Sequence, residues 1–327
     1  MAGDPKEPAR ASDGAGALPA VVVNGARVRD PARLRAACQQ AAAAAGWQPP
    51  LLLPTAPDDP GTGQARQAVE AGAALVIAVG GDGTVRACAQ ALAGTSVPLA
   101  IVPAGSANLT AHALGLPGRV GSALAVAFAG RDRPIDLGSA DGAVFVAMAG
   151  LGLDAAVVGG ALGLTKRLTG WPAYAAAAVG QLLRRPVTFA IRLDGGPPLT
   201  RHARCVTVGN SGALPGGFAV MPDACLDDGR LDVVVLAPSG LLGWADVGRR
   251  VAAGSRRDDR QLERYQASTI EIRAEGAGGP GRGGLPRQLD GELIEPSDRL
   301  SVQVLPGALV TRAPLGAAKN RAGSRAD

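Results

Sequence analysis

Short apolar runs alternate with helix-like segments through the first third of the chain. Asp30 precedes Pro31, which is typical of a helix N-cap followed by a first helical position, and Gly46 and Gly72 stand where two helix-like segments end. Strands that alternate with helices indicate a parallel sheet with helices on both faces. The expected strands are Ala20–Val23, Leu51–Leu53, Ala74–Val79 and Pro98–Val102, and the expected helices run from Pro31 to about Ala45, from Thr62 to Ala71, from about Val85 to Leu92 and from Ser106 to about Leu114.

The pattern changes after about Arg133, where many short strand-like runs are separated by turn signals such as Asp194-Gly195-Gly196. Many short strands of this kind favour a mostly antiparallel β-sandwich as a second domain. We therefore expect a flexible arm at 1–18, an α/β domain at 19–133, a β-sandwich at 134–311 whose last segment can return to the first domain, and a flexible tail at 312–327. The expected strands are Ile135–Leu137, Ala143–Met148, Thr188–Leu193, Cys205–Val208, Leu231–Leu236, Thr269–Arg273 and Leu300–Val304, with helices near Lys166–Leu183 and Leu241–Ala253.

One stretch is long enough to suggest a membrane span. Residues from Ala87 to Gly118 carry no formal charge over 32 positions, but three prolines divide the stretch and its middle is polar. A second uncharged stretch, Leu168 to Leu183, has 16 residues and contains Pro172. We expect a soluble or peripheral protein without a transmembrane helix.

Composition narrows the function classes. The chain has 327 residues, of which 47% are hydrophobic and 19% charged, so most of it should fold. The net charge of +5 is compatible with phosphates or an anionic membrane surface, but no basic stripe interleaved with aromatic residues or nucleic-acid motif is present, which argues against nucleic-acid binding. The N-terminus has no apolar stretch typical of a secretory signal. The four cysteines, Cys38, Cys88, Cys205 and Cys225, lack paired spacing and suit the reducing cytoplasm.

The most informative motif is Val79-Gly80-Gly81-Asp82-Gly83-Thr84-Val85, between a buried strand and a helix. Glycines at such a turn let backbone N–H groups approach a phosphate, and the helix N-terminus adds partial positive charge. Asp82 can contact a metal ion or orient a ribose or water, and Thr84 can donate a hydrogen bond to a phosphate oxygen. The motif has neither the Gly-Lys-Ser/Thr of a P-loop nor the spacing of a dinucleotide fingerprint, and an ordinary Gly-rich turn is the alternative.

A second loop, Pro103-Ala104-Gly105-Ser106-Ala107-Asn108, follows the next strand. Adjacent parallel strands carry their following loops to the same edge of the sheet, where ligands bind. Two loops of glycine and hydroxyl residues at one edge favour a cleft for a triphosphate.

These motifs resemble the diacylglycerol and sphingosine lipid kinase family in its bacterial branch. GGDGTV at 80–85 and PAGSANLTAHALGLP at 103–117 carry the resemblance, and it continues in the family's order to about residue 310. GGDGT alone is shared with NAD kinases, whereas the ordered set of motifs is far more specific. The downstream matches are Ile135-Asp136-Leu137-Gly138, Phe145 to Ala155, Gly209-Asn210-Ser211-Gly212, Gly216-Gly217, Met221 to Asp232 and Leu289-Asp290-Gly291-Glu292.

The resemblance implies ATP and Mg²⁺ as cofactors, transfer of the γ-phosphoryl group to a lipid hydroxyl, and an active site between the two domains. It implies that Asp228 supplies a carboxylate to a structural Mg²⁺, with backbone carbonyls from Cys225 and Arg230. It also implies a general base in the late acidic motif, at Asp290 or Glu292. The residues expected to border ATP are Thr55, Gly80, Gly81, Asp82, Gly83, Thr84, Val85, Arg86, Gly105, Ser106 and Asn108.

The sequence departs from the family pattern in its first loop, which reads Asn24-Gly25-Ala26-Arg27 where Asn-Pro-x-Ser/Ala-Gly is usual. After GGDGT the usual Asn-Glu is absent, and Arg86 stands where it can face a phosphate. The second loop has Ser106 where threonine is common, which keeps the hydroxyl.

A lipid hydroxyl is a poor nucleophile at neutral pH, and a carboxylate that accepts its proton is the usual remedy. Asp290 and Glu292 would share one face of a strand but could diverge on a glycine turn. The residues leave the choice of base open, and we take Asp290 first because it leads the motif. The alternative for both residues is a solvated acidic turn.

Other features have two interpretations. Asp227-Asp228-Gly229-Arg230 is either a Mg²⁺ loop or a plain hairpin turn. Asp154 either lines the cleft or caps a turn. The stretch from Lys166 to Arg185, with Trp171 and Tyr174 in an apolar middle, could touch a membrane interface, although a helix packed on the sandwich is the simpler interpretation. His112 and His202 have no partner at metal-ligand spacing and are expected to be structural.

We therefore expect an ATP- and Mg²⁺-dependent lipid kinase that converts diacylglycerol to phosphatidic acid. It would be cytoplasmic, peripherally associated with the inner face of the cell membrane, and compatible with a homodimer. The alternatives are an enzyme like NAD kinase, and a nucleotide-binding regulator without turnover.

Overall fold

The structure is a computed structural model that describes residues 16–152, 185–212, 220–275 and 284–315. The chain forms two compact units, which are described separately. Unit 1 comprises Met1–Ala104, Leu114–Pro134 and Leu309–Ala318, and unit 2 comprises Gly105–Ala113, Ile135–Ala308 and Lys319–Asp327. The chain passes between the units within strands β5 (Arg131–Ala140) and β16 (Arg299–Ala313) and at both ends of the segment Gly105–Ala113.

The sheet of unit 1 is parallel and runs in the order β2-β1-β3-β4, with the end of β16 beside β4 through the pair Thr311 and Leu99. Its central strand, β3, is buried along its whole length, as expected of a parallel strand covered on both faces. The bounds are β1 (Pro19–Val23), β2 (Leu51–Pro54), β3 (Leu75–Gly80) and β4 (Leu99–Pro103).

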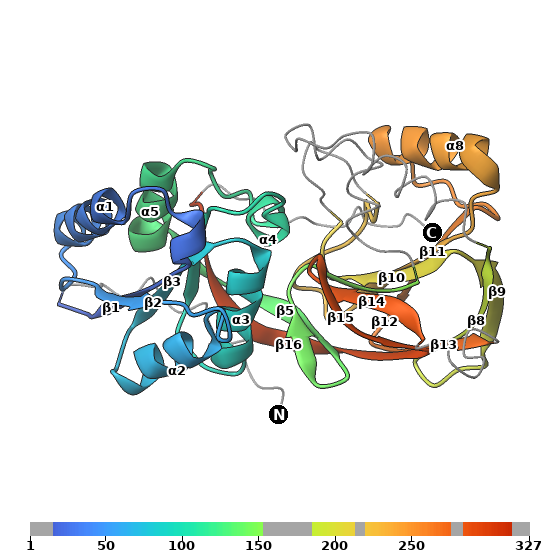
Figure 1. Ribbon diagram of the computed structural model, residues 1–327, viewed down its shortest axis with the longest axis horizontal. Coiled ribbons are helices and arrows are strands. Elements are labelled where there is room, and N and C mark those ends of the chain that lie inside the picture. Colours follow the sequence, from blue (N-terminus) through green and yellow to red (C-terminus); the bar gives the residue numbers. More distant parts are fainter. Residues whose placement is uncertain (1–15, 153–184, 213–219, 276–283, 316–327) are drawn as a thin grey trace, which may run out of the picture. The chain divides into compact units, whose positions relative to one another are not determined.

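Helices cover both faces of this sheet (Figure 1). Apolar residues of α1 (Pro31–Ala44) and α5 (Val120–Ala129) form one core with the strands, and α2 (Thr62–Glu70) and α3 (Asp82–Leu92) lie on the other face. The carboxylate of Asp30 accepts the N–H of Arg33 at 2.9 Å, which confirms the expected cap of α1. The sequence analysis missed α5 because its ten residues contain no charge and show little helical periodicity.

Unit 2 contains two mostly antiparallel sheets. One has the order β12-β11-β10-β7-β14-β15, and the other joins β9, β8 and β13 to β16, with β5 and β6 beside it. The expected fold class, an α/β domain followed by a mostly antiparallel β-sandwich, is confirmed. The bounds are β6 (Ala143–Phe145), β7 (Met148–Leu151), β8 (Val187–Leu193), β9 (Leu199–Ala203), β10 (Cys205–Gly209), β11 (Leu231–Leu236), β12 (Leu262–Ala267), β13 (Thr269–Glu275), β14 (Leu285–Leu289), β15 (Glu292–Ser297), α4 (Leu109–Ala113) and α8 (Gly240–Ala252).

The core of unit 2 lies between its two sheets. Phe145 and Phe189 are fully buried there among aliphatic side chains of both sheets, such as Val208 and Ile270. A second, smaller core lies between α8 and the outer side of β10, β11 and β12. The sheet that contains β10, β11 and β12 is therefore covered on both faces there, whereas β13 in the other sheet has alternately buried and exposed residues.

Several expected elements differ from the observed ones. The run Ala143–Met148 is divided between β6 and β7, and α3 begins at Asp82 rather than near Val85, so half of the glycine motif lies in a helical turn. The uncharged stretch Ala87–Gly118 is divided among α3, β4 and α4, and no helix in the described part of the chain is long and apolar enough to cross a membrane. The expected helix at Lys166–Leu183 lies outside the described residues.

Candidate active site

The loops expected to bind nucleotide follow neighbouring parallel strands of unit 1. Val23 pairs with both Pro54 and Val79, and Gly80 pairs with Pro103, so the four strands end at the same level of the sheet. Three backbone hydrogen bonds join these ends: Asn24 N to Val79 O at 3.0 Å, Thr55 N to Val23 O at 2.9 Å, and Ala104 N to Gly80 O at 2.8 Å. The carboxyl edge of a parallel sheet is where such folds bind ligands.

The glycine motif opens α3 directly. Gly81 is the residue before the helix, and among the described hydrogen bonds no side chain caps the first turn. The first N–H groups of a helix have no partner within the helix, and together they attract an anion. Asp82 and Gly83 lie partly exposed in this first turn, where a phosphate would meet them.

Thr84 has a structural role that the sequence did not indicate. Its side chain is buried, and its Oγ1 accepts a hydrogen bond from Asn24 Nδ2 at 3.2 Å. A Cβ at Gly80 would stand 2.6 Å from both Cβ and Oγ1 of Thr84, so only glycine fits at that position. Asn24, from the loop that departs from the family pattern, thus supports the glycine motif through Thr84. Val85, the next residue after Thr84, is a buried core residue.

The second loop belongs to unit 2. Asn108 adopts a left-handed φ of 49°, its Oδ1 accepts the N–H of Gly105 at 2.8 Å, and its Nδ2 donates to Gly105 O at 2.9 Å. Both ends of the Asn108 amide therefore shape the loop and leave Ser106 exposed on it. Leu109, which follows, packs on Ala147 of unit 2, and this apolar contact explains why the segment 105–113 is grouped with that unit.

The late acidic motif forms a tight hairpin between β14 and β15. Asp290 and Gly291 have φ values of 49° and 85°, which is the type I′ pattern that Asp-Gly favours. The carboxylate of Asp290 is 3% exposed and accepts three backbone hydrogen bonds from the segment between β6 and β7. The donors are Val146 N at 2.9 Å, Ala147 N at 2.8 Å and Met148 N at 2.9 Å.

The two carboxylates of this hairpin therefore have different surroundings. Asp290 also donates its own N–H to Met148 O at 2.7 Å, so its main chain and side chain are both anchored to one segment. Glu292 begins β15 at an edge of the sheet and is exposed. Burying a carboxylate is costly unless donors surround it, and three donors surround Asp290.

The Asp227-Asp228-Gly229-Arg230 turn is held by a carboxylate from another strand. Asp136, on β5, accepts Gly229 N at Oδ2 and Gly307 N at Oδ1, both at 2.7 Å. Asp136 N donates to Leu226 O at 2.6 Å, which adds a main-chain link to the same loop. Asp228 Oδ1 accepts the N–H of Arg230 at 3.0 Å, so this side chain faces back into its own turn.

The electrostatics of this turn favour a cation. Partial desolvation raises the pKa of Asp228 above its usual value, and the negative charge of Asp136 raises it further. Burial is also the main cause that raises the pKa of nearby Asp232 to about 7, with Asp228 and Asp223 contributing. Among the described residues no group of three His, Cys, Asp or Glu side chains is arranged to hold a metal ion. The expected ligand set differs from such a cluster, because it has one carboxylate, Asp228, and otherwise carbonyl oxygens, which are donors that suit Mg²⁺.

Sequence reasoning left two framework residues without a role. Asp136 connects β5, the acidic turn and β16, and Asn210 is fully buried with its Nδ2 donating to Asp136 O at 2.6 Å and Val146 O at 3.3 Å. Asn210 therefore links the acidic turn to the segment that holds Asp290. Both residues lie in motifs that carry the family resemblance, and the available signal was a polar residue within β5, for Asp136, or directly after the apolar strand β10, for Asn210. Asp154, Gly216-Gly217 and most of the stretch 166–185 lie outside the described residues.

Comparisons with known proteins cover both units. Residues 20–140 match the diacylglycerol kinase catalytic domain, and residues 147–312 match the YegS C-terminal NAD kinase beta sandwich-like domain. A Pseudomonas fluorescens protein described as a probable lipid kinase YegS-like is 32% identical over 85% of this chain and 90% of its own length. The diacylglycerol kinase of Mycobacterium tuberculosis is 30% identical over 64% of this chain and 70% of its own. A solved diacylglycerol kinase from Bacillus anthracis shares the fold, with a TM-score of 0.68, 21% identity, and coverage of 91% of this chain and 96% of that one.

Proposed function

Because this chain belongs to the family of YegS-like and diacylglycerol kinase-like lipid kinases, we propose that it transfers the γ-phosphoryl group of ATP to the hydroxyl of diacylglycerol. The products are phosphatidic acid and ADP. The observation that carries the proposal is the hairpin at Asp290-Gly291-Glu292, where a buried, anchored carboxylate precedes an exposed one by two residues.

ATP binds at the carboxyl edge of the parallel sheet of unit 1. The first turn of α3, with Gly81, Asp82 and Gly83, offers backbone N–H groups to the phosphates. Asn24 and Thr84 hold this turn against β1, and Thr55 borders the same edge. In unit 2, the exposed hydroxyl of Ser106 serves the nucleotide, and Gly105 and Asn108 shape its loop.

Glu292 is the proton acceptor, and Asp290 is a positioning residue. A general base must accept a proton from the acceptor hydroxyl, and the lone pairs of Asp290 are directed to three backbone N–H groups. Glu292 takes the hydroxyl proton as the hydroxyl oxygen forms its bond to the γ-phosphorus. The bond between the γ-phosphorus and the bridging oxygen breaks, and ADP leaves with the electron pair.

The Asp228 carboxylate and the carbonyl oxygens of Cys225 and Arg230 would hold Mg²⁺ at the acidic turn. Bound there, the ion supplies positive charge that offsets the adjacent carboxylates Asp228 and Asp136. Asp136 holds the turn in place through Gly229 N, so the loop is shaped by the protein itself.

The test is transfer of labelled γ-phosphate from ATP with Mg²⁺ into diacylglycerol in mixed micelles, sphingosine or NAD. The variants are Glu292→Gln and its matched control Glu295→Gln, an exposed carboxylate on the same strand. The proposal is supported if native protein transfers label to diacylglycerol, Glu292→Gln lowers the rate of this transfer by about 10² to 10⁴-fold, and Glu295→Gln leaves the rate unchanged. Label in sphingosine or NAD alone contradicts the proposed acceptor, and bound ATP without any transfer contradicts the proposed activity.

A further inference from the structure

Helix α8 exposes a mostly apolar stripe in which Arg249 is the one charged residue. Its inner face, with Val247 and Val251, packs on the sheet of β10, β11 and β12. The outer stripe is Leu242, Ala245, Arg249 and Ala252, at the helical spacing i, i+3, i+7 and i+10, and all four residues are exposed. A surface helix of a water-soluble domain normally carries polar residues on this side.

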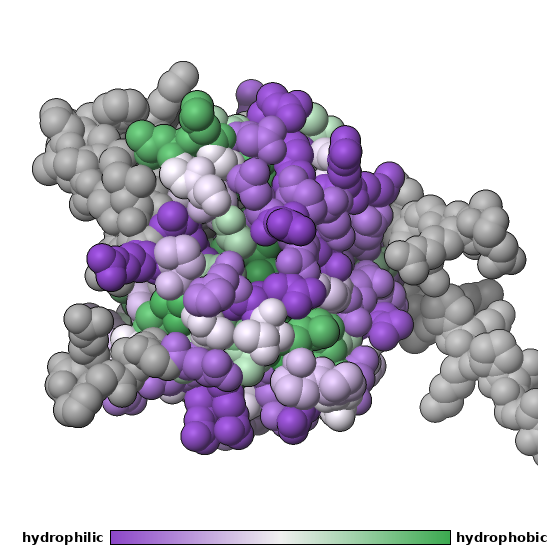
Figure 2. Space-filling view, turned by 90° about the vertical axis from the view of Figure 1, so that its right-hand side faces the viewer, coloured by the Kyte–Doolittle hydropathy of each residue, from purple (hydrophilic) through white to green (hydrophobic). Residues whose placement is uncertain are grey.

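The large apolar side chains of this helix that are exposed lie at its start. Leu242 is 87% exposed and Leu241 beside it is 56% exposed. Five large apolar side chains are exposed in the described part of the chain, and among them Leu241 and Leu242 are the two that are neighbours in sequence. Figure 2 shows apolar surface at the upper edge of the face where α8 lies in Figure 1. We call Leu241, Leu242, Ala245, Arg249 and Ala252 the α8 surface.

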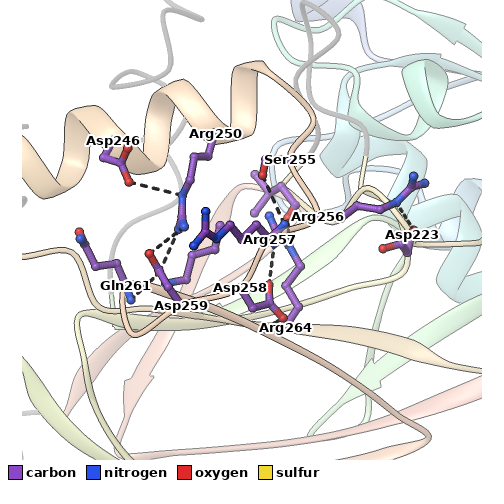
Figure 3. A network of polar contacts seen from close by, with 12 residues as sticks. Asp223, Asp246, Arg250, Ser255, Arg256, Arg257, Asp258, Asp259, Gln261 and Arg264 are labelled. Carbon is purple, nitrogen blue, oxygen red and sulfur yellow. Dashed lines mark hydrogen bonds and ion pairs between the residues drawn. The ribbon is translucent and has the colours of Figure 1, made fainter.

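Arginines follow the helix in the loop 253–261. Its carboxylates are held by arginines: Asp259 by Arg250 at 2.8 Å, and Asp258 by Arg264 at 2.8 Å (Figure 3). Arg256 reaches Asp223 at 2.7 Å, outside the loop. Among the described residues, Arg257 and Arg260 have no acidic partner, and both are exposed.

Ala237 N donates to Gln261 O at 2.9 Å, so this loop returns to the start of α8, where the exposed leucines lie. Exposed leucines together with surplus positive charge are what an anionic lipid surface complements. We propose that the α8 surface docks on a membrane containing anionic lipids. Leu241 and Leu242 enter the interfacial region, and Arg257 and Arg260 contact lipid phosphates. The inference goes beyond the proposed function, because it does not depend on which alcohol is phosphorylated.

A second copy of the chain fits this surface less well. In a two-fold symmetric dimer the same patch meets itself, so the arginines of one copy would approach those of the other. Like charges brought together at an interface oppose association, whereas anionic lipid headgroups neutralise them. Charge complementarity therefore favours a membrane.

The experiment is co-sedimentation of the full chain with vesicles of phosphatidylcholine alone or mixed with phosphatidylglycerol. The variants are Leu241→Ser with Leu242→Ser, and Arg257→Gln with Arg260→Gln. The matched controls are Leu315→Ser, at an exposed leucine, and Arg192→Gln, at an exposed arginine of β8. Circular dichroism checks that each variant is folded, and light scattering reports the oligomeric state.

Native protein is expected to bind the anionic vesicles, and the serine double variant to lose about tenfold or more of its partition coefficient. The glutamine double variant should lose about fivefold per arginine on anionic vesicles only, and high salt should reproduce this loss. Both controls should bind as the native protein does.

Three outcomes overturn the proposal: no binding of native protein to anionic vesicles, equal binding by the serine double variant and native protein, or equal loss in the two controls. A native dimer that the serine substitutions convert to monomer, with vesicle binding unchanged, assigns the surface to self-association instead.

Phosphoryl transfer to a short-chain, monomeric diacylglycerol is measured in parallel. It should be unchanged in the variants, and its absence from native protein contradicts the proposed function without affecting the vesicle result.

Discussion

Truncation of Asp290 tests whether this carboxylate positions the active-site hairpin or performs chemistry. In Asp290→Ala, the N–H groups of Val146, Ala147 and Met148 lose their acceptor inside a buried site. An unsatisfied buried donor costs about 1–3 kcal/mol, and water that enters the truncated site recovers part of this. We therefore expect a destabilisation of about 4 kcal/mol. For a unit of this size that corresponds to a fall in unfolding temperature of roughly 8 to 16 °C.

Asp290→Asn is a gentler change with a distinct expectation. Its Oδ1 can still accept from Ala147 and Met148, but its amide N–H groups would face the Val146 N–H if they replace Oδ2. Two opposed donors and the lost charge should cost about 2 kcal/mol, roughly half the effect of alanine. Glu292→Gln, at an exposed position, should leave the unfolding temperature unchanged.

Differential scanning calorimetry and phosphoryl-transfer kinetics on the same preparations separate the two roles. A positioning role predicts that activity lost in Asp290→Asn is partly recovered at low temperature, where the variant is folded, whereas Glu292→Gln remains inactive at every temperature. An unchanged unfolding temperature in both Asp290 variants, together with loss of activity, would refute the structural reasoning. Full activity in Glu292→Gln would refute its assignment as the base.

Four further predictions concern the two units. Burial raises the pKa of Asp232 to about 7 from a usual 3.8, so the protonated carboxyl stabilises the fold fully below about pH 4, and this stabilisation is lost as the pH rises to about 7. Denaturant unfolding in the presence of a metal chelator should show that Asp232→Asn removes about 4 kcal/mol of this pH dependence. Gly80→Ala should weaken ATP binding about tenfold or more by calorimetry, and adding Thr84→Ala should restore part of it, because the new Cβ meets the Thr84 side chain. Mg²⁺ should raise the unfolding temperature of native protein but not of Asp228→Asn. Burial raises the pKa of the Cys88 thiol to about 12, so a thiol reagent at neutral pH should modify it only after denaturation; a native rate equal to that of free cysteine would contradict this burial.

The sequence predicted unit 1 well where local signals are strong. The cap at Asp30, the run of buried β-branched and aliphatic residues in β3, and the glycine motif after it are all properties of consecutive residues, and the structure contains the corresponding elements. Unit 2 was harder, because β14 and β15 have mixed composition, contain Pro286 and Pro296, and lack a regular alternation of burial. Their Asp-Gly turn was a usable hairpin signal that the sequence analysis did not apply.

The order of motifs along the chain was sufficient to predict the fold class and the family, because glycine turns, capping residues and acidic turns act within a few residues of themselves. Tertiary structure alone showed that the surroundings of Asp290 and Glu292 differ, since the donors that surround Asp290 come from residues 142 to 144 positions away. It likewise placed the Asp136 carboxylate between Gly229 and Gly307, and buried the Thr84 side chain against Gly80. Burial and long-range hydrogen bonds depend on which distant segments come into contact, and these contacts are determined by the free energy of folding of the whole chain.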